Sequence, residues 1–188
     1  MFRSKAKTKL LEFKSAQISW PRHATKLHRA VKWKPPTSPH YKINFDGAIF
    51  KKQGAAGLGV VIQDSQGLVI GALSECIVMP MSAATVEALV SRRALTFAKE
   101  LSIFDSIIEG DAEVIVNALV TKDGSHPEDG HVITNTLSLA ADFRFCMFTH
   151  VKRLGNLVAH FLARCAKFGS ELQVWIECIP NDIAPLVT

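Results

Sequence analysis

The first regular pattern of apolar and polar residues in the chain lies at residues 41–46, where the two kinds alternate as in a half-buried β-strand. Residues 58–62 form an apolar run with β-branched side chains, and residues 68–73 form another. The segment Asp64–Gly67 between these two runs has the composition of a tight turn. Three strands joined by short connections predict an antiparallel meander.

The period of the pattern changes after Ser82. From this residue to Leu101 the apolar positions recur at helical spacing, and serine is a favourable residue to cap a helix N-terminus. The rest of the pattern predicts a strand at 104–109, helices at 112–120 and 131–141, a strand at 144–151 and a helix at 156–168. The order β-β-β-α-β-α-α-β-α predicts an α/β fold in which helices pack on a mixed sheet.

Charge divides the chain into two unequal parts. Of its 22 lysines and arginines, ten lie in residues 1–34, where Glu12 is the only acid. The remainder of the chain holds the other 12 basic and 16 acidic residues, so a net charge of +9 is followed by −4. A basic segment of this kind can bind a nucleic-acid backbone in a salt-dependent way, or it can be a solvated leader or an organelle-targeting segment.

Prolines at positions 35, 36 and 39 indicate a boundary, because they disfavour helix and favour an extended chain. We therefore expect a basic extension at residues 1–34, a proline-rich linker at 35–40, one domain at 41–170 and an extended segment at 171–188.

The sequence also suggests the class of protein. No apolar run approaches the roughly 20 residues of a membrane-spanning helix, and the N-terminus lacks a secretory signal. We expect a soluble, intracellular monomer without a membrane partner. The cysteines are widely spread and form no C-x-x-C pair, which favours buried reduced thiols over a zinc or redox site: Cys76, Cys146, Cys165 and Cys178.

Three acidic residues have positions that suggest chemistry. Asp46 and Asp111 lie at the ends of predicted strands, and Glu87 lies in the first long helix. If the first and fourth strands are parallel neighbours, the three carboxylates meet at one edge of the sheet. Grouped carboxylates repel one another unless a cation neutralises them, and their hard oxygen atoms suit Mg²⁺ or Mn²⁺. The alternative is that these acids only form turns or cap helices, as acids at strand ends often do.

Several segments occur in an order and with gaps that loops can span: residues 43–48, 57–64, 86–89, 108–112 and 150–163. Together with the leading Trp33-Lys34-Pro35-Pro36, they resemble the plant ribonuclease-H-like domain family, which is related to type 1 ribonuclease H and to reverse-transcriptase ribonuclease H domains. The resemblance covers residues 33 to 180. It implies a ribonuclease-H-like α/β fold with a mixed five-stranded sheet, three strands antiparallel and two parallel, and helices on both faces.

The resemblance also implies a function and its residues. Asp46, Glu87 and Asp111 match three metal-binding acids of enzymes that cut the RNA strand of RNA–DNA hybrids with two divalent ions. Catalytic members carry a fourth acid where this chain has His160, and imidazole binds Mg²⁺ poorly, so one metal position is weakened. Some plant relatives also have histidine there. The expected catalytic residues are thus these four, with the three acids as ligands of Mg²⁺ or Mn²⁺.

Other residues near these segments have simpler expected roles. The connection from Lys152 to Gly155 is too short for the flexible histidine loop of bacterial enzymes, so His150 is expected to be an interior or edge residue without a catalytic role. Asn156 is expected to be the N-cap of the last helix.

Four basic residues are candidates for contact with a nucleic-acid backbone. Lys51 and Lys52 lie in the first hairpin, whereas Lys152 and Arg153 lie beside the expected site. Exposed charge without a ligand is the alternative for all four. A hybrid would be recognised by its shape and its 2′-hydroxyl groups rather than by its bases.

Three functional hypotheses follow from the sequence. The first is a two-metal endoribonuclease that cleaves the RNA strand of RNA–DNA hybrids. The second is a catalytically weak or inactive nucleic-acid-binding module of retroelement origin, motivated by His160 and the basic extension. The third is a protein-interaction domain that has lost nucleic acid, motivated by the net charge of −4 in the domain.

Overall fold

The structure is a computed structural model that describes residues 33–187, apart from residues 126 and 170. The basic extension expected at residues 1–34 lies outside the described residues except for Trp33 and Lys34. The strands are β1 (Tyr41–Phe50), β2 (Ala55–Gln63), β3 (Val69–Val78), β4 (Asp105–Gly110), β5 (Phe145–His150) and β6 (Leu172–Ile176). The helices are α2 (Ala83–Glu100), α3 (Glu113–Thr121), α4 (Gly130–Ala140) and α5 (Leu157–Cys165), with short 3-10 turns η1 (Lys51–Gln53), η2 (Arg153–Gly155) and η3 (Ala184–Leu186).

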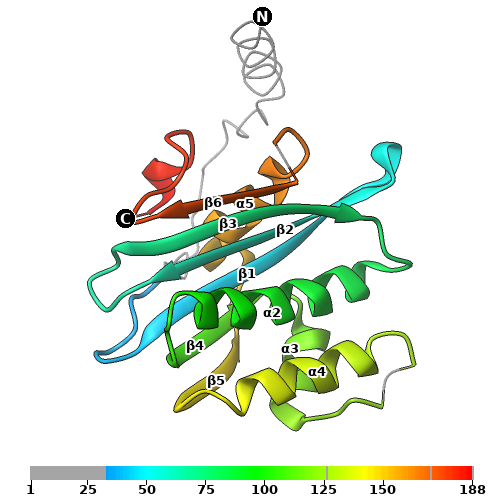
Figure 1. Ribbon diagram of the computed structural model, residues 1–188, viewed down its shortest axis with the longest axis horizontal. Helices are drawn as coiled ribbons and strands as arrows, with labels where there is room; N and C mark the ends of the chain where they lie inside the picture. Colours follow the sequence, from blue (N-terminus) through cyan, green and yellow to red (C-terminus); the bar gives the residue numbers. More distant parts are fainter. Residues whose placement is uncertain (1–32, 126, 170, 188) are drawn as a thin grey trace, which may run out of the picture. The chain divides into compact units, whose positions relative to one another are not determined.

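The strands form one mixed sheet in the order β5-β4-β1-β2-β3-β6 (Figure 1). β1, β2 and β3 are the predicted antiparallel meander, and β4 runs parallel to β1 and to β5. The predicted α/β fold with a mixed sheet is confirmed. In the described part of the chain the sheet has six strands, one more than the five expected.

The additional strand is β6, which pairs antiparallel with β3. Its residues were expected only as part of an extended C-terminal segment. Their side chains alternate, so that Trp175 packs into the apolar cluster around α5 while Val174 and Ile176 are exposed. Pairing also satisfies backbone groups that β3 would otherwise present at a free edge.

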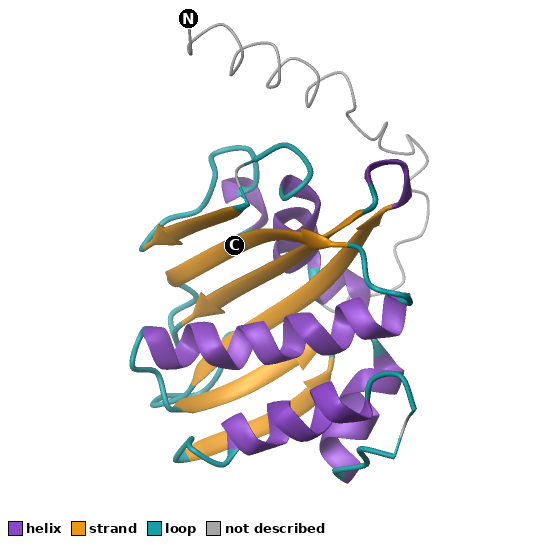
Figure 2. Cartoon of the chain, turned by 45° about the vertical axis from the view of Figure 1, so that its right-hand side comes forward, coloured by secondary structure: helices purple, strands orange, loops and turns teal. Residues whose placement is uncertain are grey.

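Helices cover both faces of the sheet, as expected, because neighbouring residues of a strand point to opposite faces. In β2, Val60 packs with the core on the α2 side, and Val61 packs with Leu162 of α5 on the other side. α3 and α4 share a further apolar cluster with α2 and lie beside it in Figure 2. None of the described helices combines the length and the apolar character that crossing a membrane requires.

Two glycines of β2 allow α5 to lie directly against the strand. A Cβ atom at Gly59 would be 2.2 Å from Ala159 O and 2.2 Å from Ala163 N, and one at Gly57 would be 2.0 Å from Ala163 O. Real Cβ atoms do not approach backbone atoms so closely. The absence of a side chain at Gly57 and Gly59 therefore allows α5 to pack this closely against the sheet.

The ends of the helices confirm one predicted cap and correct another. Ser82 Oγ accepts a hydrogen bond from Thr85 N at 3.1 Å, so this residue is the N-cap of α2. Asn156 occupies the N-cap position of α5, but its side chain makes no capping bond. It is instead turned into the protein, where it is 1% exposed and bonds to β1.

The cysteines also differ from the expectation. All four are free thiols, but Cys76, Cys146 and Cys165 are only half-buried, and Cys178 is exposed. Burial raises the pKa of the Cys146 thiol to about 12 and that of Cys165 to about 11. These two thiols stay protonated and unreactive near neutral pH.

Candidate metal centre

Asp46 lies where β1 leaves its parallel neighbour. The parallel pairing of β1 with β4 ends at Phe45 opposite Gly110, so Asp46 and Asp111 follow side by side. The sequence pattern predicted that the first strand would end at Asp46, which is wrong, because the antiparallel pairing of β1 with β2 continues as far as Phe50. The end of β4, rather than the end of β1, creates the edge at which the two aspartates meet.

Glu87 reaches this edge from the second turn of α2. Gly47 allows the approach, because a Cβ atom there would lie 2.7 Å from Val86 Cγ1 and 3.1 Å from Glu87 Oε1. One carboxylate oxygen from each of Asp46, Glu87 and Asp111 lies within 4.8 Å of the others. It is the one cluster of this kind in the described residues, and it brings together the three acids that the sequence singled out.

The cluster is electrostatically strained in the absence of a cation. Burial, followed by repulsion from Asp46 and Asp111, raises the pKa of Glu87 to about 8, against the opposing effects of a Gly47 backbone hydrogen bond and of Arg153. Burial and the charge of Asp46 also raise the pKa of Asp111. Each raised pKa means that the nearby positive charge and hydrogen bonds do not offset the cost of burying the carboxylate anion beside other carboxylates.

One carboxylate oxygen of the cluster is buried without a hydrogen-bond partner in the described part of the chain. Glu87 Oε2 is enclosed by the protein and has no hydrogen-bond partner among the described residues. A buried polar atom without a partner is costly, and in native proteins it often indicates an ion or a water molecule. Three converging carboxylates with an orphaned oxygen fit a hard divalent cation such as Mg²⁺ or Mn²⁺.

The fourth expected site residue, His160, faces Asp46 from α5. Its Nδ1 atom is 2.6 Å from Asp46 Oδ2 and 2.9 Å from Arg153 Nη2. One nitrogen cannot donate to the carboxylate and accept from the guanidinium in the same state. The carboxylate is nearer and its side chain is 2% exposed, whereas Arg153 is 61% exposed. We therefore assign the bond as Nδ1–H donating to Asp46.

The other predicted contact residues lie in different places. Arg153 is at the cluster, with Nη1 3.7 Å from Asp111 Oδ2. Lys51 and Lys52 are exposed in η1, at the tip of the hairpin, and Lys152 is exposed before η2. His150 lies at the end of β5, where its Nε2 is 3.2 Å from the Asp111 carbonyl oxygen.

Sequence reasoning missed a set of buried polar side chains next to the cluster. Asn44, two residues before Asp46, is 2% exposed and bonds to Asn156, Glu109 and Trp33. A signal was present, because Lys42, Asn44 and Asp46 place polar side chains on one face of a strand whose other face is apolar. Which partners they meet depends on tertiary contacts.

Comparison with known proteins places these observations in a family. A family model described as reverse transcriptase-like matches residues 44–166, which is more than half of the chain and includes the three acids and His160. β6 lies outside the matched residues. No curated protein matches the sequence significantly.

Solved structures show the same fold. Ribonuclease H1 from the halophilic archaeon Halobacterium salinarum is 24% identical, with a TM-score of 0.63 over 68% of this chain and 97% of that chain. LC11 ribonuclease H1, found in compost and solved in complex with an RNA/DNA hybrid, is 23% identical, with a TM-score of 0.61 over 67% and 95%. A foamy viral protease-reverse transcriptase in complex with dsDNA is 14% identical, with a TM-score of 0.52 over 69% and 93%. The fold is therefore ribonuclease-H-like.

Proposed function

The chain belongs to the reverse transcriptase-like family, and on this basis we propose that it is a metal-dependent endoribonuclease that cleaves the RNA strand of RNA–DNA hybrids. The observation that carries the proposal is the convergence of three carboxylates within 4.8 Å, one of which has an orphaned buried oxygen. The fold is shared with a ribonuclease H1 that was solved with an RNA/DNA hybrid, which supports the choice of substrate.

In this proposal Asp46, Glu87 and Asp111 hold Mg²⁺ or Mn²⁺ in a two-ion mechanism. When bound, such ions supply an activated water and a counter-charge for the leaving 3′-oxygen. The side chains of the protein set where this happens. Glu87 offers the oxygen that has no other partner, and Asp46 keeps one oxygen for His160 and one for a ligand.

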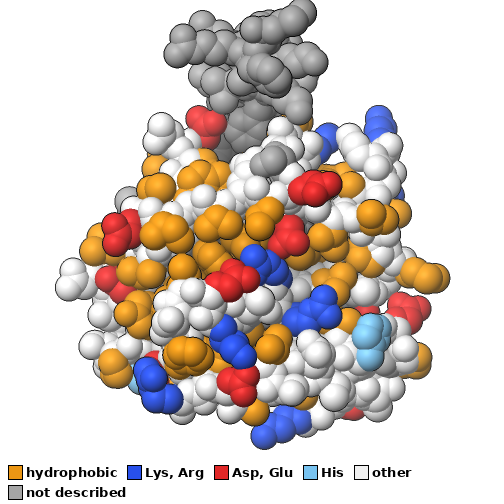
Figure 3. Space-filling view, viewed as in Figure 1, with side chains coloured by type: hydrophobic (Ala, Val, Ile, Leu, Met, Phe, Trp, Pro, Cys, Tyr) orange, Lys and Arg blue, Asp and Glu red, His pale blue; other side chains and the backbone are white. Residues whose placement is uncertain are grey.

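Contact with the nucleic-acid backbone is proposed for residues near the cluster. Arg153 is largely exposed beside Asp111, so its guanidinium can meet a phosphate oxygen, and Lys152 is its neighbour. Lys51 and Lys52 extend from the hairpin into solvent. On the face that carries α2, by contrast, basic side chains are mixed with acidic and apolar ones rather than gathered in one patch (Figure 3).

A labelled RNA–DNA hybrid incubated with Mg²⁺ or Mn²⁺ tests the proposal. Asp46→Asn removes a central ligand with little change in size, and we expect cleavage to fall to the metal-free background. Asp142→Asn is the matched control, since Asp142 follows α4 and pairs with Lys99, outside the acid cluster. Cleavage that persists in Asp46→Asn, or that is lost equally in Asp142→Asn, would reject the assignment.

A second candidate function is a catalytically weak or inactive nucleic-acid-binding module of retroelement origin. The specific observation in its favour is His160, which gives Asp46 a hydrogen-bond donor at the position of the fourth acid. The fold shared with a foamy viral reverse transcriptase is consistent with this origin. Binding to a hybrid that weakens steeply with salt, without cutting in either metal, would favour the module over the enzyme.

A further inference from the structure

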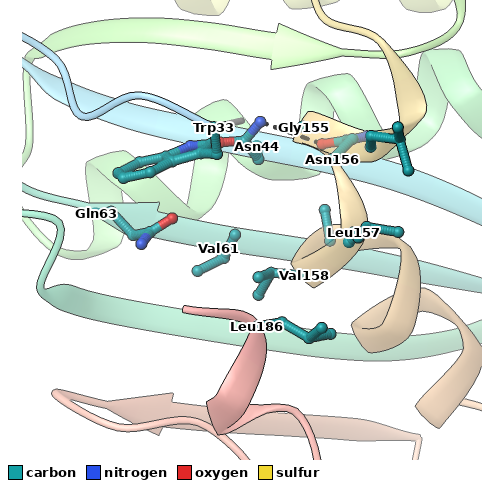
Figure 4. A pocket seen from close by; sticks show the side chains of 11 residues that line it. Trp33, Asn44, Val61, Gln63, Gly155, Asn156, Leu157, Val158 and Leu186 are labelled. Carbon is teal, nitrogen blue, oxygen red and sulfur yellow. Dashed lines mark hydrogen bonds between the residues drawn. The ribbon is translucent and has the colours of Figure 1, made fainter. Parts of the chain in front are cut away.

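A buried group of amide side chains lies next to the acid cluster, on the same face of β1. Asn44 and Asn156 are 2% and 1% exposed. Because strand residues two apart point to the same face, Asn44 shares the face of Asp46. Figure 4 shows the two asparagines facing each other, with Trp33 on one side and the start of α5 on the other.

The hydrogen bonds of Asn44 fix the orientation of its amide. Its Oδ1 accepts a bond from Trp33 Nε1 at 3.0 Å. Its Nδ2 donates to Asn156 Oδ1 and to Glu109 Oε2, both at 3.2 Å. Both amide hydrogens and the amide oxygen are in use, and a flipped amide would place donor against donor.

Asn156 joins the two elements that form one side of the metal centre. Its Nδ2 donates to Phe45 O at 2.8 Å, which is the carbonyl immediately before Asp46. Its own carbonyl accepts from His160 N at 3.0 Å, in the first turn of α5. The same residue therefore contacts the backbone beside Asp46 and the helical turn that carries His160.

The network also includes residues upstream of the strand. Lys42 Nζ donates to Lys34 O at 2.6 Å and pairs with Glu109 Oε1 at 3.0 Å, so the backbone at residue 34 is tied to β1 and β4. Together with the Trp33 bond, this contact holds residues 33 and 34 against the side of the network away from α5.

Burying amides costs free energy that an apolar pair of the same size would not. Asn156 also forgoes the capping bond that its position offers, and it uses its side chain on β1 instead. What the amides provide is a single fixed geometry, because a fully satisfied polar network allows fewer arrangements than apolar contact does.

We propose that Asn156 and Asn44 are positioning residues that set α5 against β1 and thereby hold His160 Nδ1 on Asp46. Only the consequence for catalysis rests on the proposed function; the effect on His160 does not. Trp33 contributes by holding Asn44 in the orientation that Asn156 requires.

Heteronuclear NMR of the imidazole nitrogens tests the proposal on the metal-free full chain, with the His160 signal assigned by its loss in His160→Gln. In the unmodified chain, the proton is held on Nδ1 by Asp46, so we expect one resonance typical of a protonated Nδ1. In Asn156→Ala we expect this resonance to move toward the averaged position of an exposed imidazole.

Gln63→Ala is the matched control. Gln63 is also a buried amide, 3% exposed, and lies near the same pocket, but its side chain bonds locally to Gly67 O at 3.0 Å. Loss of this amide should lower the melting temperature without moving the His160 resonance. An unchanged resonance in Asn156→Ala, or an equal shift in Gln63→Ala, would overturn the proposal.

Two milder variants keep the proposal testable if Asn156→Ala does not fold. Asn44→Ala should shift the His160 resonance in the same direction but less, and Trp33→Phe, which removes only the indole donor, should shift it least. The reverse order, or no shift in either, would contradict the proposal. The experiment uses neither metal nor hybrid, so a chain that cuts no hybrid can still pass it, and an active chain can still fail it.

Discussion

The two helices that cover opposite faces of the sheet bring different chemistry to Asp46. α2 brings Glu87, a carboxylate whose buried oxygen has no partner and whose pKa is raised to about 8. α5 brings His160, whose Nδ1 atom is 2.6 Å from Asp46 Oδ2 and which has the Arg153 guanidinium beside it. The α2 side adds a carboxyl group whose anionic form needs a cation, whereas the α5 side already provides a donor and a positive charge.

The difference between the two helices separates the attraction of the cluster for a first cation from its capacity for a second one. Asp46, Glu87 and Asp111 create the demand for a divalent ion. His160 and Arg153 reduce that demand on one side, because His160 contacts Asp46 Oδ2 and the Arg153 guanidinium lies 3.7 Å from Asp111 Oδ2. If the proposed function holds, the three acids set the capacity to bind a first ion, and the contacts from the α5 side affect whether a second ion binds.

The largest expected effect comes from separating α5 from the sheet. In Gly59→Ala the new Cβ would meet backbone atoms of α5 at 2.2 Å, which no side-chain rotation can relieve. We expect the free energy of unfolding to fall by about 3 kcal/mol, at the upper end for overpacking, as measured by urea denaturation.

Gly47→Ala provides the corresponding test on the α2 side. Its Cβ would meet the Val86 side chain at 2.7 Å, and a side chain can move more easily than a helix backbone. The expected loss is about 1 kcal/mol. An equal or larger loss in Gly47→Ala would show that α2, rather than α5, is the more tightly fixed helix.

The second prediction concerns the pH dependence of the α2 side. The pKa of Glu87 in the folded chain, about 8, lies above the ordinary value of 4.5 for a glutamate. The folded chain thus keeps a proton that the unfolded chain releases, so the associated stability is complete below pH 4.5 and is lost as the pH rises through about 8. A difference of one unit between the folded and unfolded pKa corresponds to roughly 1.4 kcal/mol of stability. Dissolved ions screen the open side of the cluster and reduce this effect. For the metal-free chain we therefore expect the free energy of unfolding to fall by only about 2 kcal/mol across this window.

Unfolding curves at several pH values measure this loss. Glu87→Gln should remove most of the slope, and Glu128→Gln, at an exposed carboxyl, should retain it. Saturating Mn²⁺ should also flatten the slope in the unmodified chain, because the ion binds the ionised carboxylates. A slope that is the same in Glu87→Gln would mean that another group carries the proton.

The acid cluster could be predicted from the sequence because its geometry follows from local features. The parallel pairing of β1 with β4 ends just before Asp46 and Asp111, and the helix that follows the meander brings Glu87 to the same edge. The sequence pattern located these acids correctly, although it ended the first strand too early. The helical period after Ser82 and the antiparallel meander were predictable for the same reason, since each depends on residues that are close in the chain.

The features that distinguish this chain depend on contacts between distant segments. Asn156 was expected to cap α5, and only the approach of β1 shows why its amide turns inward to Phe45 O. β6 was expected as an extended segment, because pairing with β3 depends on a free edge that the sequence does not display. The contact of His160 with both Asp46 and Arg153 likewise depends on how closely α5 lies against β2.

The most direct test of the comparison comes from His160→Asp, which makes the α5 side acidic like the α2 side. Without metal, Asp46 loses its donor and gains a repelling neighbour, so the melting temperature should fall by a few degrees. With metal, a fourth carboxylate should raise the Mn²⁺ affinity measured by titration calorimetry about tenfold, which corresponds to about 1.4 kcal/mol.

His160→Asn is the matched control. Asparagine has the same size as aspartate, and its amide keeps a donor for Asp46 without adding charge. If His160→Asp binds Mn²⁺ no better than His160→Asn, the α5 side is not a weakened metal position, and the imidazole has a function that a carboxylate cannot replace.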